Sequence, residues 1–319
     1  MYIEQAYKGL KDSWRYVLGF IIVLIGWQIL GMVPLLIAMA VHAVNGGGMV
    51  ATIPQMAEAF GNNMFVFLML ISFAIGLLVL FLVVLFLHRQ SITALTTSRA
   101  KIDWKRIFFA FTFWAVITIL ITGVDVYMSP DNYVWNFDVD KFLILAVIAI
   151  CLVPLQTSFE EYLFRGYLMQ SLGILTKNRW IPLVVTSTIF GLMHIFNPEV
   201  QELGYGIMVY YIGTGFFLGI LALMDEGLEL SLGFHAANNL VTALLVTADW
   251  TAFQTDSIYR DVSEPALGWD VFIPVIIIYP ALLFIFSKVY NWTNWKEKLT
   301  GNVLTEEAFL AQENNEFES

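Results

Sequence analysis

Charged residues are scarce in this chain of 319 residues: Asp, Glu, Lys and Arg make up 13% of it, and hydrophobic residues make up 59%. Soluble domains typically have about 25% charged and roughly 45–50% apolar residues. The chain therefore has too little charge to cover a soluble protein of this size, and too many apolar residues to stay unfolded. The composition excludes a soluble globular enzyme, a disordered chain and a nucleic-acid-binding protein.

Cysteine is almost absent, since Cys151 is the only one. A single cysteine excludes an internal disulfide and a metal cluster built from cysteines. A cleavable signal peptide is not expected either, because the first apolar run, residues 17–41, is longer than the roughly 7–15 residues of a signal-peptide core. We expect this run to be a retained membrane span.

Long apolar runs, by contrast, are abundant. A helix needs roughly 20 apolar residues to cross a bilayer. Eight runs approach this length: residues 17–41, 64–87, 107–124, 142–175, 180–196, 203–224, 230–248 and 271–287. Because the runs are continuous and do not alternate with polar residues, they favour helices over a β-barrel. The sequence predicts an all-α, polytopic integral membrane bundle of about eight transmembrane helices.

The same runs divide the chain. We expect one transmembrane domain at residues 17–287, with a catalytic core at 142–248. A cytoplasmic N-terminal segment, residues 1–16, precedes it, and a cytoplasmic acidic tail, residues 288–319, follows it.

Lysine and arginine predict the orientation, since they concentrate in cytoplasmic loops. If eight spans alternate, most basic residues fall on one side: Lys8, Lys11, Arg15, Arg89, Arg99, Lys101, Lys105, Arg106, Lys177, Arg179, Lys288, Lys296 and Lys298. Only Lys141 and Arg260 lie between spans on the other side. Both termini are therefore predicted to be cytoplasmic, in the plasma membrane if the source is bacterial. The net charge of −10 then reflects acidic outer loops and the acidic tail.

Ionisable residues occur in only three of the eight runs, as Glu160, Glu161, Arg165, His194 and His235. Such groups are costly in a bilayer and usually functional. A structural ion pair or a polar contact between helices is the alternative. The spacing of Glu161 and Arg165 predicts an ion pair on one helix face. Glu160 points about 100° away around the helix, so it is the better candidate for chemistry.

A carboxylate, two imidazoles and an amide suit the activation of water against a carbonyl group. Glu160 would take the proton from water, and His194 would orient the water. His235 and Asn239, at i and i+4, would donate hydrogen bonds to the developing oxyanion.

Two other chemistries are open to the same residues. Glu160, His194 and His235 could bind a divalent metal such as zinc, although the His-Glu-x-x-His motif is absent. Serine chemistry is less favoured, because Ser158 and Ser187 lie in no Gly-x-Ser-x-Gly turn and the spans contain no Asp to orient a histidine.

Three motifs resemble those of the CAAX protease and bacteriocin-processing family (CPBP, also called Abi) of intramembrane proteases. They are Glu-Glu-x-x-x-Arg at residues 160–165, Phe-x-x-x-His at 190–194 and His-x-x-x-Asn at 235–239. The resemblance implies a membrane endopeptidase related to the type II CAAX prenyl endopeptidases, which remove three residues after a prenylated cysteine. It implies Glu160 as base, His194 as its partner, and His235 with Asn239 at the oxyanion. Glu161, Arg165 and Phe190 would be supporting residues. It leaves open whether a metal takes part.

Two functions remain open at this point. The motifs favour an endopeptidase that hydrolyses a membrane peptide or protein, prenylated or not. The alternative is a non-proteolytic membrane immunity or partner protein on the same fold. In either case the expected partners are the lipid bilayer and a peptide or protein, with no nucleic acid. The oligomeric state is not predicted.

Overall fold

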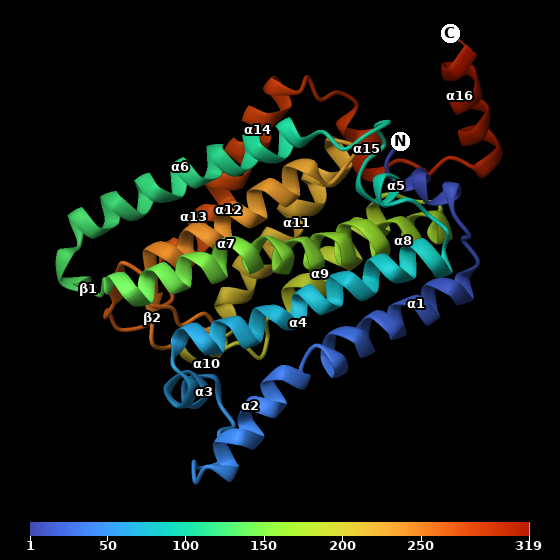
Figure 1. The fold of residues 1–319 in the computed structure, drawn as a ribbon. Helices are drawn as coiled ribbons and strands as arrows, with labels where there is room; N and C mark the ends of the chain where they lie inside the picture. The colour runs from blue at the N-terminus through green and yellow to red at the C-terminus, as the bar shows by residue number, and fades with distance from the viewer. Residues whose placement is uncertain (319) are drawn as a thin grey trace.

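Long helices dominate the structure, a computed structural model that describes residues 1–318 (Figure 1). The elements of the first half are η1 (Ile3–Lys8), α1 (Ser13–Ile25), η2 (Gly26–Leu30), α2 (Val33–Val44), α3 (Ile53–Phe60), α4 (Asn62–Leu82), η3 (Val83–Leu87), α5 (Ile92–Thr96), α6 (Trp104–Met128), η4 (Pro130–Asn132) and β1 (Tyr133–Trp135). Here η denotes a 3-10 or π-helical segment.

The second half contains the segments with the three motifs. Its elements are α7 (Val139–Glu161), η5 (Tyr162–Leu168), α8 (Met169–Thr176), α9 (Trp180–Leu192), α10 (Pro198–Leu203), η6 (Tyr205–Ile207), α11 (Met208–Met224), α12 (Glu229–Leu245), β2 (Val246–Ala248), β3 (Tyr259–Asp261), α13 (Trp269–Ile273), η7 (Pro274–Ile278), α14 (Tyr279–Val289), α15 (Trp295–Thr300) and α16 (Glu306–Glu318).

Six helical segments of the described chain are long and apolar enough to cross a membrane: Ser13–Val44, Asn62–Leu87, Trp104–Met128, Val139–Thr176, Tyr205–Asp225 and Trp269–Val289. Large apolar side chains cover their outer surfaces; Phe86, Leu120 and Val147, for example, are exposed. Apolar surface of this extent is typical of a lipid-facing protein. The prediction of an all-α, polytopic integral membrane bundle is confirmed.

The other two predicted spans are shorter helices. Helix α9 has 13 residues and α12 has 17, fewer than the roughly 20 needed for a full crossing. The predicted run 180–196 is too long as a helix, because α9 ends at Leu192 and a turn leads to Pro198, the first residue of α10. Proline disfavours a helical conformation in the residue before it. Helix α12 is buried along most of its length and packs against α6, α7 and α11.

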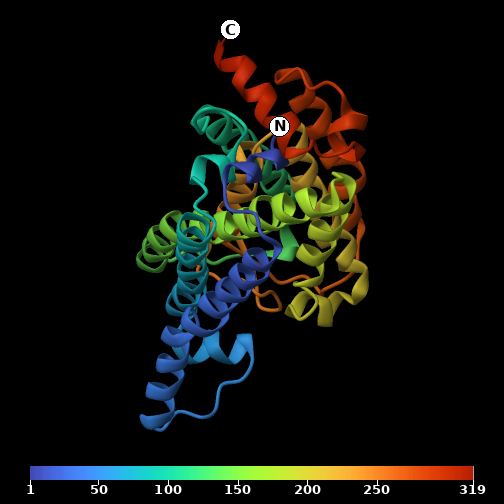
Figure 2. The same ribbon diagram turned by 90° about the vertical axis from the view of Figure 1, so that its right-hand side faces the viewer.

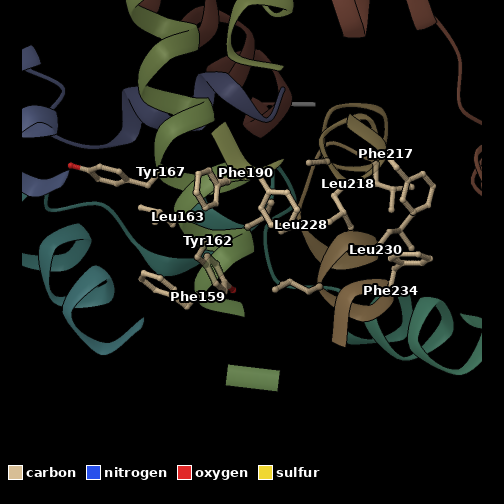
Figure 3. Packing of buried hydrophobic residues seen from close by; sticks show 14 of the residues in the cluster. Phe159, Tyr162, Leu163, Tyr167, Phe190, Phe217, Leu218, Leu228, Leu230 and Phe234 are labelled. Atoms are coloured by element: carbon tan, nitrogen blue, oxygen red, sulfur yellow. The ribbon is translucent and has the colours of Figure 1, made fainter. Parts of the chain in front are cut away.

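Helix α7 and its continuation through η5 into α8 run through the middle of the bundle (Figure 1). Helix α4 packs on α7, α12 packs on both α7 and α6, and α9 packs on α11. Figure 2 shows the bundle from the side. The largest hydrophobic cluster surrounds η5 and joins Phe159 and Leu163 to Phe190, Phe217 and Phe234 from other helices (Figure 3). The candidate site therefore lies beside the largest hydrophobic cluster of the bundle.

Basic residues from separate connections meet at one end of the bundle. Arg99 lies 3.1 Å from Asp225 and 3.1 Å from Glu229, and Arg106 also pairs with Asp225. At the same end, Arg179 pairs with Glu4 at 2.5 Å. The N-terminus and α16 lie at this end too (Figure 1). The two termini thus share one side, as the alternation requires, and its identity as the cytoplasmic side stays a prediction.

A small sheet lies at the opposite end, among the acidic loops. Strand β3 is central: β1 pairs with it antiparallel and β2 pairs with it parallel. The register places Val134 opposite Arg260 and Val246 opposite Tyr259. Each strand has three residues, so the sheet ties loops together and leaves the all-α class unchanged.

Candidate active site

The ionisable residues of the three motifs come from neighbouring helices. Glu160 and Glu161 are the last residues of α7, and Arg165 lies in the π-helical segment η5. His235 lies on α12, and His194 follows α9 in a turn. Wider π-helical turns inside α-helices are often found at functional sites. Here the π-helical turns begin directly after the two glutamates.

Glu161, Arg165 and His235 form a buried cluster. The Nη1 atom of Arg165 donates to Oε1 of Glu161 at 2.9 Å, and both side chains are fully buried. The Nδ1 atom of His235 lies 2.9 Å from the same Glu161 oxygen. The predicted Glu161–Arg165 ion pair is present, and it also orients the histidine on α12.

Arg165 is held by two further helices. Its Nη2 atom donates to the carbonyl of Gly215 on α11 at 3.0 Å, and its guanidinium carbon lies 4.2 Å from the centre of the Phe190 ring. Gly215 permits a close approach of α11 to α9, because a Cβ atom there would lie 2.5 Å from the carbonyl oxygen of Ser187. Phe190 thus contacts the buried cation, and its supporting role stays a prediction.

Glu160 points away from this pair, as its position on the helix predicts. Its Oε1 atom accepts a hydrogen bond from Nε2 of Gln156 at 2.6 Å. Its Oε2 atom lies 3.5 Å from Nε2 of His235. The side chain of Glu160 is 13% exposed, whereas that of Glu161 is fully buried. Glu160 is therefore the carboxylate that a substrate or water can reach.

His194 is oriented by two contacts. Its Nδ1 atom lies 2.9 Å from the Phe190 carbonyl, and its ring stacks on Tyr211 with centres 4.4 Å apart and planes at 18°. A carbonyl oxygen only accepts, so Nδ1 carries the proton and Nε2 of the neutral ring is an acceptor. This assignment follows from the hydrogen-bond partner.

A small cavity joins Glu160 and His194. It is lined by Trp27, Phe159, Glu160, Phe164, Phe190, Met193 and His194, and it offers about 20 Å³ of space. A water molecule needs roughly 10–15 Å³ of such space and at least two polar partners. The cavity therefore accommodates about one water molecule between a carboxylate and an imidazole.

Asn239 is linked to Glu160 through Gln156. Its Nδ2 atom donates to Oε1 of Gln156 at 3.1 Å, and Gln156 contacts Glu160. Sequence reasoning missed Gln156, although its position four residues before Glu160 places both on one helix face. It also missed Tyr211, whose place beside His194 depends on packing between helices.

The residues proposed as metal ligands do not form a ligand set. Among the described residues, no group of three or more His, Cys, Asp and Glu side chains is arranged to hold a metal ion. Glu160 and His235 approach each other, whereas Nδ1 of His194 is held by a backbone carbonyl. The side chains present therefore do not fit a metal, and the predicted metal role is not supported.

Fold and site together define a polytopic membrane protein with a carboxylate–histidine centre buried between its helices. Residues 140–241 match the model of the family described as "Type II CAAX prenyl endopeptidase Rce1-like". This segment contains all three motifs and is similar to that family, as the motifs predicted. The description of that family names an endopeptidase.

A further relative is similar along nearly the whole chain. It is the "Uncharacterized protein YyaK" of Bacillus subtilis (strain 168), 27% identical over 294 residues that cover 91% of this chain and 95% of the relative. No solved structure matches the chain. The similarity to YyaK thus extends beyond the segment that carries the motifs.

Proposed function

We propose that the protein is an intramembrane endopeptidase in which Glu160 activates a water molecule to hydrolyse a peptide bond. The observation that carries this proposal is the cavity of one-water size lined by Glu160 and His194. In this proposal Glu160 takes a proton from that water, and the unprotonated Nε2 of His194 accepts a hydrogen bond from it. The water oxygen then attacks the peptide carbonyl carbon.

His235 is assigned to the developing oxyanion. Its Nδ1 faces Glu161 and its Nε2 faces Glu160, and ionised carboxylates only accept hydrogen bonds. In this proposal Nε2 of His235 is therefore a hydrogen-bond donor. The Nε2–H group donates a hydrogen bond to the substrate oxygen as negative charge develops there.

The leaving amine needs a proton when the peptide bond breaks. In this proposal Glu160, protonated by the attacking water, returns the proton, so the carboxylate is regenerated at the end of the cycle. Apolar and aromatic side chains supply the rest of the cavity lining, Trp27 and Phe159 among them. An apolar lining of this kind suits a substrate that reaches the site from the membrane, with or without a prenyl group.

The experiment compares the C-termini of membrane proteins in cells that express the wild type or Glu160→Gln. Mass spectrometry should find new C-termini only with the wild type. Glu202→Gln is the matched control, because this carboxylate lies on α10, is exposed and is not part of the cavity lining. Identical sets of C-termini with wild type and Glu160→Gln would contradict the proposal.

A further inference from the structure

A chain of side-chain hydrogen bonds crosses three helices and ends on Glu160. Trp114 on α6 donates from Nε1 to Oδ1 of Asn238 at 3.1 Å. Asn238 donates to Asn239 at 3.1 Å, and Asn239 donates to Gln156 at 3.1 Å. Gln156 then donates to Oε1 of Glu160 at 2.6 Å. These hydrogen bonds follow the packing of α6 on α12 and of α12 on α7 (Figure 1).

The two ends of this chain determine its direction. An indole N–H can only donate, and an ionised carboxylate can only accept. Each of the three amides between them must therefore accept through its oxygen on the side of Trp114 and donate through its nitrogen on the side of Glu160. The amide orientations, which are otherwise ambiguous, are set by these two partners. All four hydrogen bonds point the same way, so each polarises the next towards the carboxylate.

Helix α12 thereby acts on both oxygens of Glu160. His235 lies beside Oε2, and Asn239, four residues later on the same helix face, reaches Oε1 through Gln156. Trp114 and Gln156 are both buried, so water does not readily replace their hydrogen bonds. The carboxylate is thus held in one orientation between His235 and Gln156.

We propose that Gln156 is a positioning residue for Glu160 and that Asn239 acts on the site through Gln156. Trp114 is the first donor of this hydrogen-bond relay, which runs from Trp114 to Glu160. This inference rests on the proposed function, in which Glu160 is the base. Asn239 then contributes by orienting the base, and the oxyanion is left to His235. Gln156 is absent from the cavity lining, so its loss should change turnover more than substrate affinity.

The test is a double-mutant cycle on the purified full-length protein in liposomes. Gln156→Met and Asn239→Leu keep side-chain volume and remove the hydrogen bonds. We expect each to lower kcat about ten- to a hundredfold with little change in KM. The double variant should be no slower than Gln156→Met, because both changes break one path. If Asn239 contacts the oxyanion directly, the two losses multiply, and that result overturns the inference.

An infrared measurement tests the relay without any cleavage. The wild-type minus Glu160→Gln difference spectrum isolates the carboxylate bands of Glu160. We expect these bands to shift in Gln156→Met, Asn239→Leu and Trp114→Phe. Thr118→Val is the control, because this hydroxyl lies one turn after Trp114 on α6 and has no hydrogen-bond partner among the described residues. Unshifted bands in Gln156→Met overturn the inference. If the bands shift in the variants but the wild type cleaves no peptide, only the proposed function is refuted.

Discussion

The Nδ1 atom of His235 and Nη1 of Arg165 both lie 2.9 Å from the same oxygen, Oε1 of Glu161. One buried carboxylate thus joins the first and third motifs, although 74 residues separate Glu161 from His235. The relationship gives the second glutamate of the motif a defined task. It neutralises the arginine and orients the histidine, while the first glutamate is left free to face the cavity.

Removing the charge of Glu161 should destabilise the protein. Glu161→Gln leaves Arg165 buried with no ionised partner in the cluster except the more distant Glu160. Breaking a buried ion pair from one side typically costs about 3–5 kcal/mol. We expect a clearly lower melting temperature in detergent and loss of cleavage. Asp12→Asn, which breaks the exposed pair with Arg15, is the control and should melt close to the wild type. Equal melting temperatures of the two variants would contradict a stabilising role of Glu161 in the buried cluster.

Phe190 should matter for turnover beyond its contribution to packing. Its ring lies 4.2 Å from the Arg165 guanidinium carbon, and such contacts contribute roughly 0.5–2 kcal/mol. Phe190→Leu and Phe286→Leu, which is buried on α14 away from the site, should both lower stability by about 1–3 kcal/mol. Only Phe190→Leu should also lower kcat, by about tenfold. A similar loss of kcat in both variants would show that lost packing, and not the contact with Arg165, lowers kcat.

Cleavage should not depend on a divalent metal. Glu160, His194 and His235 do not gather as a ligand set, and the proposed base acts on water directly. Dialysis of the purified protein against a strong chelator should leave kcat within about twofold of the untreated sample. The assay uses a membrane peptide with mass-spectrometric detection. Loss of activity that zinc restores would contradict the metal-free proposal.

Stability should fall at mildly acidic pH because of His88, which lies outside the spans. Burial lowers the pKa of His88, whose Nδ1 lies 2.8 Å from the carbonyl of Leu10. In the unfolded chain the pKa is about 6.5, so the unfolded state binds the proton first as pH falls. The contribution of neutral His88 to the free energy of unfolding is thus present above about pH 6.5 and is lost below it. The difference in melting temperature between wild type and His88→Gln should shrink from pH 8 to pH 5.5; a constant difference would contradict this.

Local spacing made part of the site predictable. Glu161 and Arg165 are four residues apart on one helix, and helical geometry brings such residues together whatever surrounds them. The same geometry separates Glu160 from its neighbour. The family resemblance rested on three short motifs, and the match over residues 140–241 confirmed it. The helical membrane fold was predictable because apolar runs of this length have few other solutions.

Contacts between helices were not predictable from one sequence. Nothing in the spacing of Trp114 or Tyr211 relates them to residues of the motifs, because packing angles and rotations of helices decide which side chains meet. The early end of α9 was missed for a similar reason: hydropathy continues to Phe196, while the turn before Pro198 stops the helix at Leu192. Gln156 was visible as a polar residue on the face of Glu160, yet its partner on α12 was not.

The most direct test of the central claim is the cleavage rate of purified Glu160→Gln on a membrane peptide that the wild type cleaves. Glutamine keeps the shape of the side chain and cannot take a proton from water. We predict that kcat falls at least about a thousandfold, the upper part of the range for loss of a general base, while the melting temperature stays close to that of the wild type. Cleavage by Glu160→Gln at more than a tenth of the wild-type rate would contradict the assignment of Glu160 as the base.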